Sequence, residues 1–155
     1  MPGTDVDYLR RALELAARGE REGEVPVGAL VVIDGEIIAE AWNRPIGACD
    51  PTAHAEILAL REAARRTGSW RLEWCVLYVT LEPCPMCAGA LVNARIEEVV
   101  YGADDPKAGA VRTLYGICED PRLNHRLQVV PGVLAEACAA ELRAFFAALR
   151  SEGKK

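Results

Sequence analysis

The sequence predicts one three-layer α/β/α domain with a central five-stranded mixed sheet. Its 155 residues are the length of a single domain, and 51% of them are hydrophobic, which is enough to bury a core. Strand-like apolar runs alternate with segments whose apolar residues recur at helical spacing. A tight hairpin near the N-terminus adds an antiparallel pair, so a mixed sheet with helices on its faces is expected over residues 1–155.

The N-terminal part of the chain predicts a helix followed by this hairpin. Thr4 and Asp7 have the spacing of a capping box, and apolar residues follow at helical intervals until Gly19, where the helix is expected to end. The dipeptide Asp34-Gly35 is a strong signal for a two-residue turn. The strands that it joins are predicted over 28–33 and 36–41.

The rest of the chain alternates strands and helices between recognisable breakers. Pro45, Gly47 and Pro51 indicate a loop, Gly68 a helix end, and Pro85 the first turn of a helix. The predicted elements are a loop over 43–51, a helix over 52–67, strands over 75–81, 98–101 and 127–130, and helices over 85–94 and 134–150.

The composition favours a soluble, cytoplasmic protein with reduced cysteines. No apolar run approaches the roughly 20 residues of a membrane span, and the N-terminus lacks the pattern of a signal peptide. Six cysteines in such a chain favour free thiols, with metal binding for a close pair. The net charge of −5 argues against a general nucleic-acid binder. Residues 61–155 and the Lys154-Lys155 tail within them could still present a local basic surface, or only a differently composed solvated face.

Two short motifs place metal-binding side chains at the starts of two predicted helices. His54 begins one of them, and Cys84 and Cys87 begin the next. Positions i and i+3 are neighbours on a helix, and the positive end of the helix dipole favours thiolates. Two thiolates and one imidazole form a three-ligand zinc site, which leaves a fourth position for water, as in catalytic zinc centres. One Zn²⁺ per chain is therefore predicted.

Glu56 is the candidate proton carrier of this site. It follows His54 by two residues, and side chains in the first turn tilt back toward the helix N-terminus. From there the carboxylate can reach a water held by the metal, take its proton and deliver it elsewhere. Glu56 need not be a ligand.

Two other interpretations of the cysteine pair remain open. A closed structural zinc site needs a fourth protein ligand, for which the candidates are Cys49, Cys75, Cys118, His125 and Cys138. A redox pair of the thioredoxin type usually begins at the end of the first strand of a βαβ unit, and a proline also occupies one of the two positions between Cys84 and Cys87.

Together the motifs have the H-x-E and P-C-x-x-C pattern of zinc nucleobase deaminases. The chain resembles the bacterial tRNA-specific adenosine deaminases of the cytidine deaminase-like superfamily, over nearly its whole length. The resemblance is carried most densely by Trp42-Asn43-Arg44-Pro45-Ile46-Gly47, Asp50-Pro51-Thr52-Ala53-His54-Ala55-Glu56, Leu77-Tyr78-Val79-Thr80-Leu81-Glu82-Pro83-Cys84, Met86-Cys87-Ala88-Gly89-Ala90 and Asn124-His125-Arg126.

The resemblance implies roles for six further residues and for a partner subunit. It implies that Asn43 hydrogen-bonds the target nucleotide, with Val27 and Leu81 as pocket walls, although both would also pack in an ordinary core. It further implies that Asp105 lies near the target ribose, that Arg44 contacts the RNA loop, and that Phe146 meets anticodon bases. As alternatives, Asn43 could be a turn residue, Asp105 could only begin a turn and Phe146 could be a core residue. The resemblance also implies a homodimer and a tRNA anticodon stem-loop as partner.

The activity that the resemblance implies is hydrolytic deamination of adenosine to inosine at the wobble position of a tRNA, with a zinc-activated water and Glu56 as proton shuttle. The alternative is a zinc-dependent deaminase of a free nucleobase or nucleoside, such as guanine, cytosine or adenosine. The chain departs from the family where Ala147-Ala148 stand in place of arginines and where Cys49 replaces a polar residue.

Overall fold

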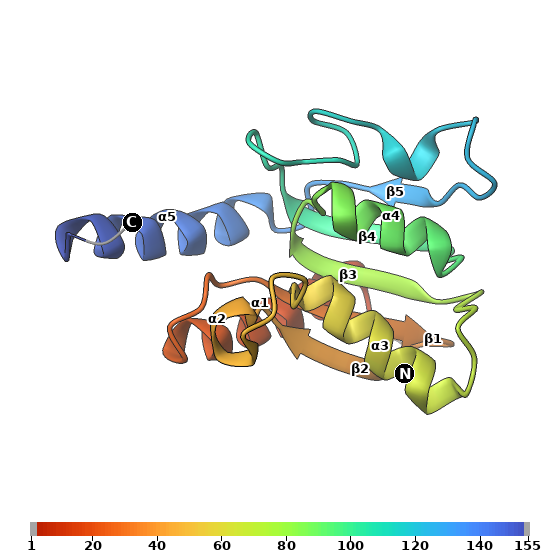
Figure 1. Ribbon diagram of the computed structural model, residues 1–155, viewed down its shortest axis with the longest axis horizontal. Coiled ribbons are helices and arrows are strands. Elements are labelled where there is room, and N and C mark those ends of the chain that lie inside the picture. The colour runs from red at the N-terminus through yellow and green to blue at the C-terminus, as the bar shows by residue number, and fades with distance from the viewer. Residues whose placement is uncertain (1–2, 154–155) are drawn as a thin grey trace.

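The computed structural model describes residues 3–153, so Met1, Pro2 and the Lys154-Lys155 tail lie outside it (Figure 1). The elements in chain order are α1 (Asp5–Arg21), β1 (Gly28–Ile33), β2 (Glu36–Trp42), α2 (Pro45–Ala48), α3 (Ala55–Thr67), β3 (Val76–Leu81), α4 (Pro85–Asn93), β4 (Glu98–Ala103), the 3₁₀ helix η1 (Ile117–Glu119), β5 (Gln128–Val130) and α5 (Ala135–Ser151).

The five strands form one mixed sheet, as predicted, and the structure gives their order as β2-β1-β3-β4-β5. β1 runs antiparallel to β2 and to β3, whereas β3, β4 and β5 are parallel. Parallel neighbours need a crossover, and α4 supplies it between β3 and β4. β2, β3 and β4 therefore end at the same end of the sheet, called here the carboxyl end.

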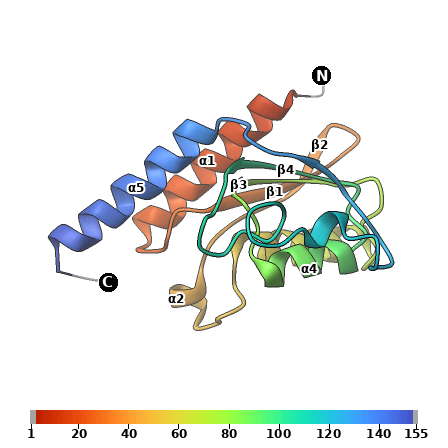
Figure 2. The same ribbon diagram turned by 90° about the horizontal axis from the view of Figure 1, so that it is seen from above.

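Helices cover both faces of the sheet and complete the three predicted layers. α1 and α5 lie on one face, and α3 and α4 on the other (Figure 2). Adjacent strand residues face opposite layers, so two apolar clusters form. Leu77 and Val79 belong to the cluster under α3 and α4, while Tyr78 and Val100 belong to the cluster under α1 and α5.

Local sequence signals account for the first helix and the hairpin. The Thr4 hydroxyl accepts from the Asp7 amide and the Asp7 carboxylate accepts from the Thr4 amide, which confirms the capping box. Asp34 and Gly35 have φ values of 51° and 79°. Positive φ at both central residues is the requirement of a type I′ hairpin turn, so the predicted turn is confirmed.

Several predicted boundaries were wrong because packing overrides local signals. α1 continues through Gly19 to Arg21, and the Trp42 ring packs against that glycine. β4 continues through Gly102 to Ala103, because this glycine admits α5: a Cβ there would lie 2.4 Å from Cys138 Sγ. The segment predicted as a loop over 43–51 contains the short helix α2.

The helix predicted from residue 52 begins only at Ala55. The Asp50 carboxylate instead holds the Thr52 amide and hydroxyl in a turn, at 2.8 and 2.7 Å. Within residues 3–153, no helix has the length and apolar character needed to cross a membrane.

Candidate metal centre and active site

The three predicted metal donors come from two helix starts at the carboxyl end of the sheet. His54 is the N-cap residue of α3 and Cys84 is the N-cap residue of α4, both with extended backbone. Neither side chain caps its own helix, so both are free to point at a common centre. Cys87 lies in the first turn of α4 and is fully buried.

The donor atoms have the spacing that a zinc ion requires. His54 Nδ1 lies 3.5 Å from Cys84 Sγ and 3.5 Å from Cys87 Sγ, and all three atoms lie within 4.8 Å of one another. Zinc bonds of about 2.0–2.1 Å to nitrogen and about 2.3 Å to sulfur place tetrahedral nitrogen and sulfur ligands about 3.6 Å apart. The cluster therefore fits a zinc ion as it stands.

Within the described part of the chain, no further histidine, cysteine or carboxylate joins this group. His125 Nε2 instead lies 2.7 Å from the carbonyl oxygen of Ile96. The remaining cysteines are free: Cys49 is exposed, and Cys75, Cys118 and Cys138 are buried. The closed structural site thus lacks its fourth ligand, and the geometry favours a centre with one position open.

Hydrogen bonds among the three donor side chains shift their pKa values. A hydrogen bond from the Cys87 thiol lowers the pKa of Cys84 to about 4, and the same bond raises the pKa of Cys87 above its ordinary value. The hydrogen bond between His54 and Cys84 raises the pKa of His54. A metal would replace these shared protons, because thiolate and neutral imidazole are the forms that bind it.

Glu56 is buried beside this cluster, with only 5% of its surface exposed. Burial raises the pKa of its carboxyl to about 7, while the charge of His54 acts in the opposite direction. A carboxyl with a pKa near neutrality can both accept and donate a proton, which is what a shuttle requires. Glu56 is not one of the clustered donors, so its position suits proton transfer and not metal binding.

The structure brings Val27, Asn43 and Leu81 together in one row across the sheet. The Asn43 amide donates to the Val27 carbonyl at 3.0 Å, continuing the β1–β2 register. The β1–β3 register, continued by two residues, places Val27 opposite Leu81. Three residues that are distant in sequence thus border the segment that leads from β3 to Cys84.

Arg44 and Phe146 both reach the surface. The Arg44 guanidinium lies 5.9 Å from the centre of the Trp42 ring. Phe146 is 41% exposed and packs edge-on against Phe145, with ring centres 5.3 Å apart. The helix that carries this pair, α5, projects beyond the sheet (Figure 1). Phe146 is thus not a core residue, and its role in RNA binding stays a prediction.

Asp105 follows the end of β4 and forms a turn with its own side chain. Its Oδ1 accepts from the amides of Lys107 and Ala108, at 2.9 and 3.2 Å. The turn-forming alternative is therefore present in the structure. The contact with a ribose stays a prediction.

Two buried carboxylates were not singled out from the sequence. Glu24 and Glu82 are each only 2% exposed. Glu24 accepts from the amides of Ile46 and Gly47 in α2, at 3.1 and 2.7 Å. Glu82 accepts from the amides of a loop that follows β4. The one available signal was a charged residue directly after an apolar strand, as at Glu82.

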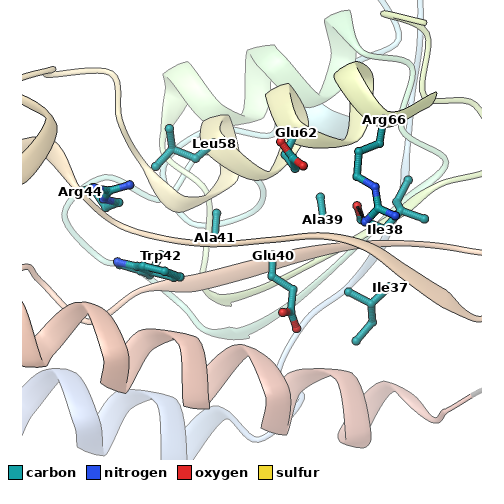
Figure 3. A pocket seen from close by; sticks show the side chains of 10 residues that line it. All are labelled: Ile37, Ile38, Ala39, Glu40, Ala41, Trp42, Arg44, Leu58, Glu62 and Arg66. Atoms are coloured by element: carbon teal, nitrogen blue, oxygen red, sulfur yellow. Dashed lines mark hydrogen bonds between the residues drawn. The ribbon is translucent and has the colours of Figure 1, made fainter. Parts of the chain in front are cut away.

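A groove of about 560 Å³ along the free edge of β2 is not part of the metal centre (Figure 3). Glu40 and Arg66 in its lining are already engaged: Glu40 pairs with Arg11, and Arg66 donates to the carbonyl of Ile38. None of the three metal donors lines it. The groove is therefore separate from the donor cluster at the helix starts.

Comparison with protein families identifies the class to which this fold and site belong. Residues 2–103 match the family model of the cytidine and deoxycytidylate deaminase zinc-binding region. The matched stretch contains all three metal donors and Glu56. The layered fold, the donor cluster and this match define a zinc-dependent hydrolytic deaminase.

Individual relatives narrow the class further. A tRNA-specific adenosine deaminase of Bacillus subtilis is 51% identical over 150 residues, covering 97% of this chain and 93% of the relative. One from Haemophilus influenzae is 50% identical, covering 97% and 87%. A solved structure of a tRNA:A34 deaminase, which edits A to I at the wobble position, has a TM-score of 0.85 and 42% identity, covering 88% of this chain and 99% of that chain. The chain belongs to the tRNA-specific adenosine deaminase family.

More distant relatives share the fold and act on other substrates. The structure of a guanine deaminase from Nitrosomonas europaea has a TM-score of 0.79 and 26% identity, covering 95% of this chain and 86% of that chain. The fold alone therefore does not determine which nucleobase is deaminated.

Proposed function

We propose that this protein converts adenosine to inosine at the wobble position of a tRNA anticodon, releasing ammonia. The observation that carries the proposal is the three-donor cluster beside the buried carboxyl of Glu56, within a chain about half identical to tRNA-specific adenosine deaminases.

In this proposal His54, Cys84 and Cys87 hold one zinc ion. Zinc with three protein ligands supplies a water that ionises near neutral pH. Glu56 accepts the proton of the attacking water and passes it to N1 of the adenine ring. It then carries the second proton to the amine leaving C6, so one carboxyl serves first as base and then as acid.

We assign substrate binding to the row of Asn43, Val27 and Leu81. Asn43 offers both a hydrogen-bond donor and an acceptor to the target nucleotide, and the two apolar side chains form the walls of its pocket. An adenine inside a stacked helix hides C6, so the target base must be splayed out before it can enter. An anticodon loop presents such bases.

We assign the contacts with the RNA outside the base pocket to Arg44, Asp105 and Phe146. Arg44 is exposed next to α2, and Phe146 offers a partly exposed ring on the projecting helix α5. Aromatic rings of this kind bind unpaired bases by stacking. The free carboxylate oxygen of Asp105 remains for a ribose hydroxyl, because Oδ1 is occupied by the turn.

We also propose that the active form is a homodimer in the cytoplasm, where tRNA is present. The face between α3 and α4 is a shallow apolar groove that includes Ile57, Trp70 and Ala90, and Trp70 is 61% exposed. Small residues on α4 allow close packing: Gly89 and Ala90 are half-buried, whereas Ala88 is buried inside the chain. Light scattering should give twice the chain mass of 16.8 kDa. A monomer at micromolar concentration contradicts the dimer.

The test of the substrate is a comparison at equal concentration. The purified protein is incubated with an anticodon stem-loop carrying a wobble adenosine, and separately with adenosine, guanine and cytidine. The proposal requires inosine in the stem-loop and little reaction of the free compounds. Faster deamination of a free base or nucleoside would support the alternative function, and the zinc-dependent chemistry would remain.

A further inference from the structure

Glu82 is a buried carboxylate whose partners are almost all backbone amides. No lysine or arginine of residues 3–153 forms a salt bridge with it. Its Oε1 accepts from the Asp105 amide at 3.0 Å and from the Thr113 hydroxyl. Its Oε2 accepts from the amides of Val111, Arg112 and Thr113, at 3.1, 2.8 and 2.9 Å. Both ends of the loop over 105–113 therefore converge on one side chain.

This convergence adds to the packing of the loop, in which Ala110 and Val111 are buried in the core. Hydrogen bonds to an ionised acceptor are about twice as strong as neutral ones, and a buried charge without partners is costly. Gly109 closes the loop over the carboxylate, because a Cβ there would lie 2.3 Å from Glu82 Oε1. The Ala110 amide also donates to the Pro83 carbonyl at 2.9 Å. The loop is thus attached to both Glu82 and Pro83, the two residues that directly precede Cys84.

The same contacts place Asp105 relative to the proposed base pocket. Leu81 pairs with Ala103 across β3 and β4, and the Glu82 amide donates to the Ala103 carbonyl at 2.8 Å. Asp105 lies two residues farther along and is held to Glu82 by its own amide. The position of Asp105 therefore depends directly on the Glu82 carboxylate.

We propose that Glu82 is a positioning residue for substrate binding: it fixes the loop over 105–113 against the metal-binding segment so that Asp105 stands at the rim of the site. This inference rests on the proposed function, in which Asp105 meets the ribose of the target nucleotide. Glu82 itself touches neither the substrate nor the metal donors. It acts through the loop.

Glu82→Gln tests the proposal because the new side chain can keep all but one of these bonds. With its carbonyl oxygen in the place of Oε2, glutamine still accepts from the three amides of Val111, Arg112 and Thr113. Its NH₂ group can donate to the Thr113 hydroxyl but faces the Asp105 amide, which is also a donor. The bond of Asp105 is therefore lost, whereas the three bonds to the amides of Val111, Arg112 and Thr113 persist as weaker, neutral ones.

Two measurements read out this loss. Hydrogen exchange at the Asp105 amide should accelerate at least about tenfold, and clearly more than exchange at the amides of residues 111–113, which keep a hydrogen-bond acceptor. KM for the stem-loop should rise about tenfold, equivalent to about 1.4 kcal/mol, with kcat within about twofold of wild type and zinc still at about one per chain. A merely structural role would lower folded protein and zinc without separating KM from kcat. Unchanged exchange and KM overturn the proposal.

Matched variants locate the effect. Glu24→Gln should accelerate exchange at Ile46 and Gly47 and leave the Asp105 amide protected, because Glu24 binds the amides of α2 and none of the loop over 105–113. Glu14→Gln removes one charge at an exposed position of α1 and should change neither readout. Gly109→Ala leaves the carboxylate intact and pushes the loop away from it, so it should reproduce the rise in KM even if Glu82→Gln fails to fold. A wild-type KM in Gly109→Ala contradicts the proposal.

The exchange measurement needs no substrate and so separates this inference from the proposed function. If the wild-type chain does not convert the stem-loop, the proposed function fails and with it the link to the ribose. If the Asp105 amide of the wild-type chain exchanges as fast as an unprotected amide, the positioning role fails whatever the substrate is.

Discussion

Replacement of Glu56 by glutamine removes the proposed proton carrier while preserving its shape. The side chain is 5% exposed, so an uncharged isostere should keep the fold and the metal donors in place. A general acid–base step contributes about 10²–10⁴ in rate. Because the site is buried, bulk water cannot substitute readily for the carboxyl, and because Glu56 acts in two steps, the loss should lie in the upper half of that range. A factor of about 10³–10⁴ corresponds to about 4–5.5 kcal/mol in the barrier.

The assay is single-turnover conversion of an anticodon stem-loop at pH 7, with inosine quantified by mass spectrometry after nuclease digestion. Zinc is measured on the same sample and should stay at about one per chain. Glu62→Gln, on the same helix and paired with Arg65 at the surface, is the control and should retain activity. Near-normal turnover of Glu56→Gln would remove this residue from the mechanism, and loss of zinc would make it a ligand.

Three further predictions concern the metal, the packing of α5 and the pH dependence of stability. Cys87→Ala should lose most of its zinc on dialysis, since one of three donors is gone, and metal analysis showing full retention would refute its assignment. Gly102→Ala should lower the free energy of unfolding by about 1–3 kcal/mol in urea titrations, because the new Cβ meets Cys138 Sγ. Adding Cys138→Ala to this variant should restore part of the lost stability. If the losses of the two substitutions simply add, the proposed contact is contradicted. Burial, with a smaller effect of Glu20, raises the pKa of Glu141 to about 7. The neutral carboxyl therefore contributes fully to the free energy of unfolding below about pH 4.5, and this stabilisation is lost as the pH rises through about 7. Glu141→Gln should therefore have a higher free energy of unfolding than wild type at pH 8 but not at pH 4. Because Glu141 is partly exposed, the gain should not exceed about 1 kcal/mol. An equal difference between the two proteins at both pH values would contradict this prediction.

Elements with strong local signals could be predicted from the sequence. The Asp34-Gly35 turn and the Thr4–Asp7 capping box are each determined by residues within three positions of one another, and both are present. The helix and strand ends that were predicted wrongly lie where contacts with an element distant in sequence determine the backbone. The strand predicted over 98–101 continues through Gly102, because the missing side chain of this glycine makes room for Cys138 on α5, which no neighbouring residue indicates.

The same distinction applies to the site. His54, Cys84 and Cys87 stand in short motifs at helix starts, so their meeting could be inferred from spacing and helix geometry. The row of Val27, Asn43 and Leu81 depends on strand register, and only the family resemblance pointed to it. Glu82 could not be found in this way, because its partners lie 23–31 residues away in a loop without secondary structure of its own.

The central claim is an open zinc centre with three protein ligands, and X-ray absorption at the zinc edge of the purified protein tests it most directly. The structure predicts two sulfur ligands at about 2.3 Å, from Cys84 and Cys87, and two nitrogen or oxygen ligands at about 2.0–2.1 Å, one from His54 and one from solvent. The Cys87→Ala chain, if it retains any zinc, should show one sulfur fewer. A shell of three or four sulfurs, or a second histidine in place of solvent, would show a closed structural site and contradict the account.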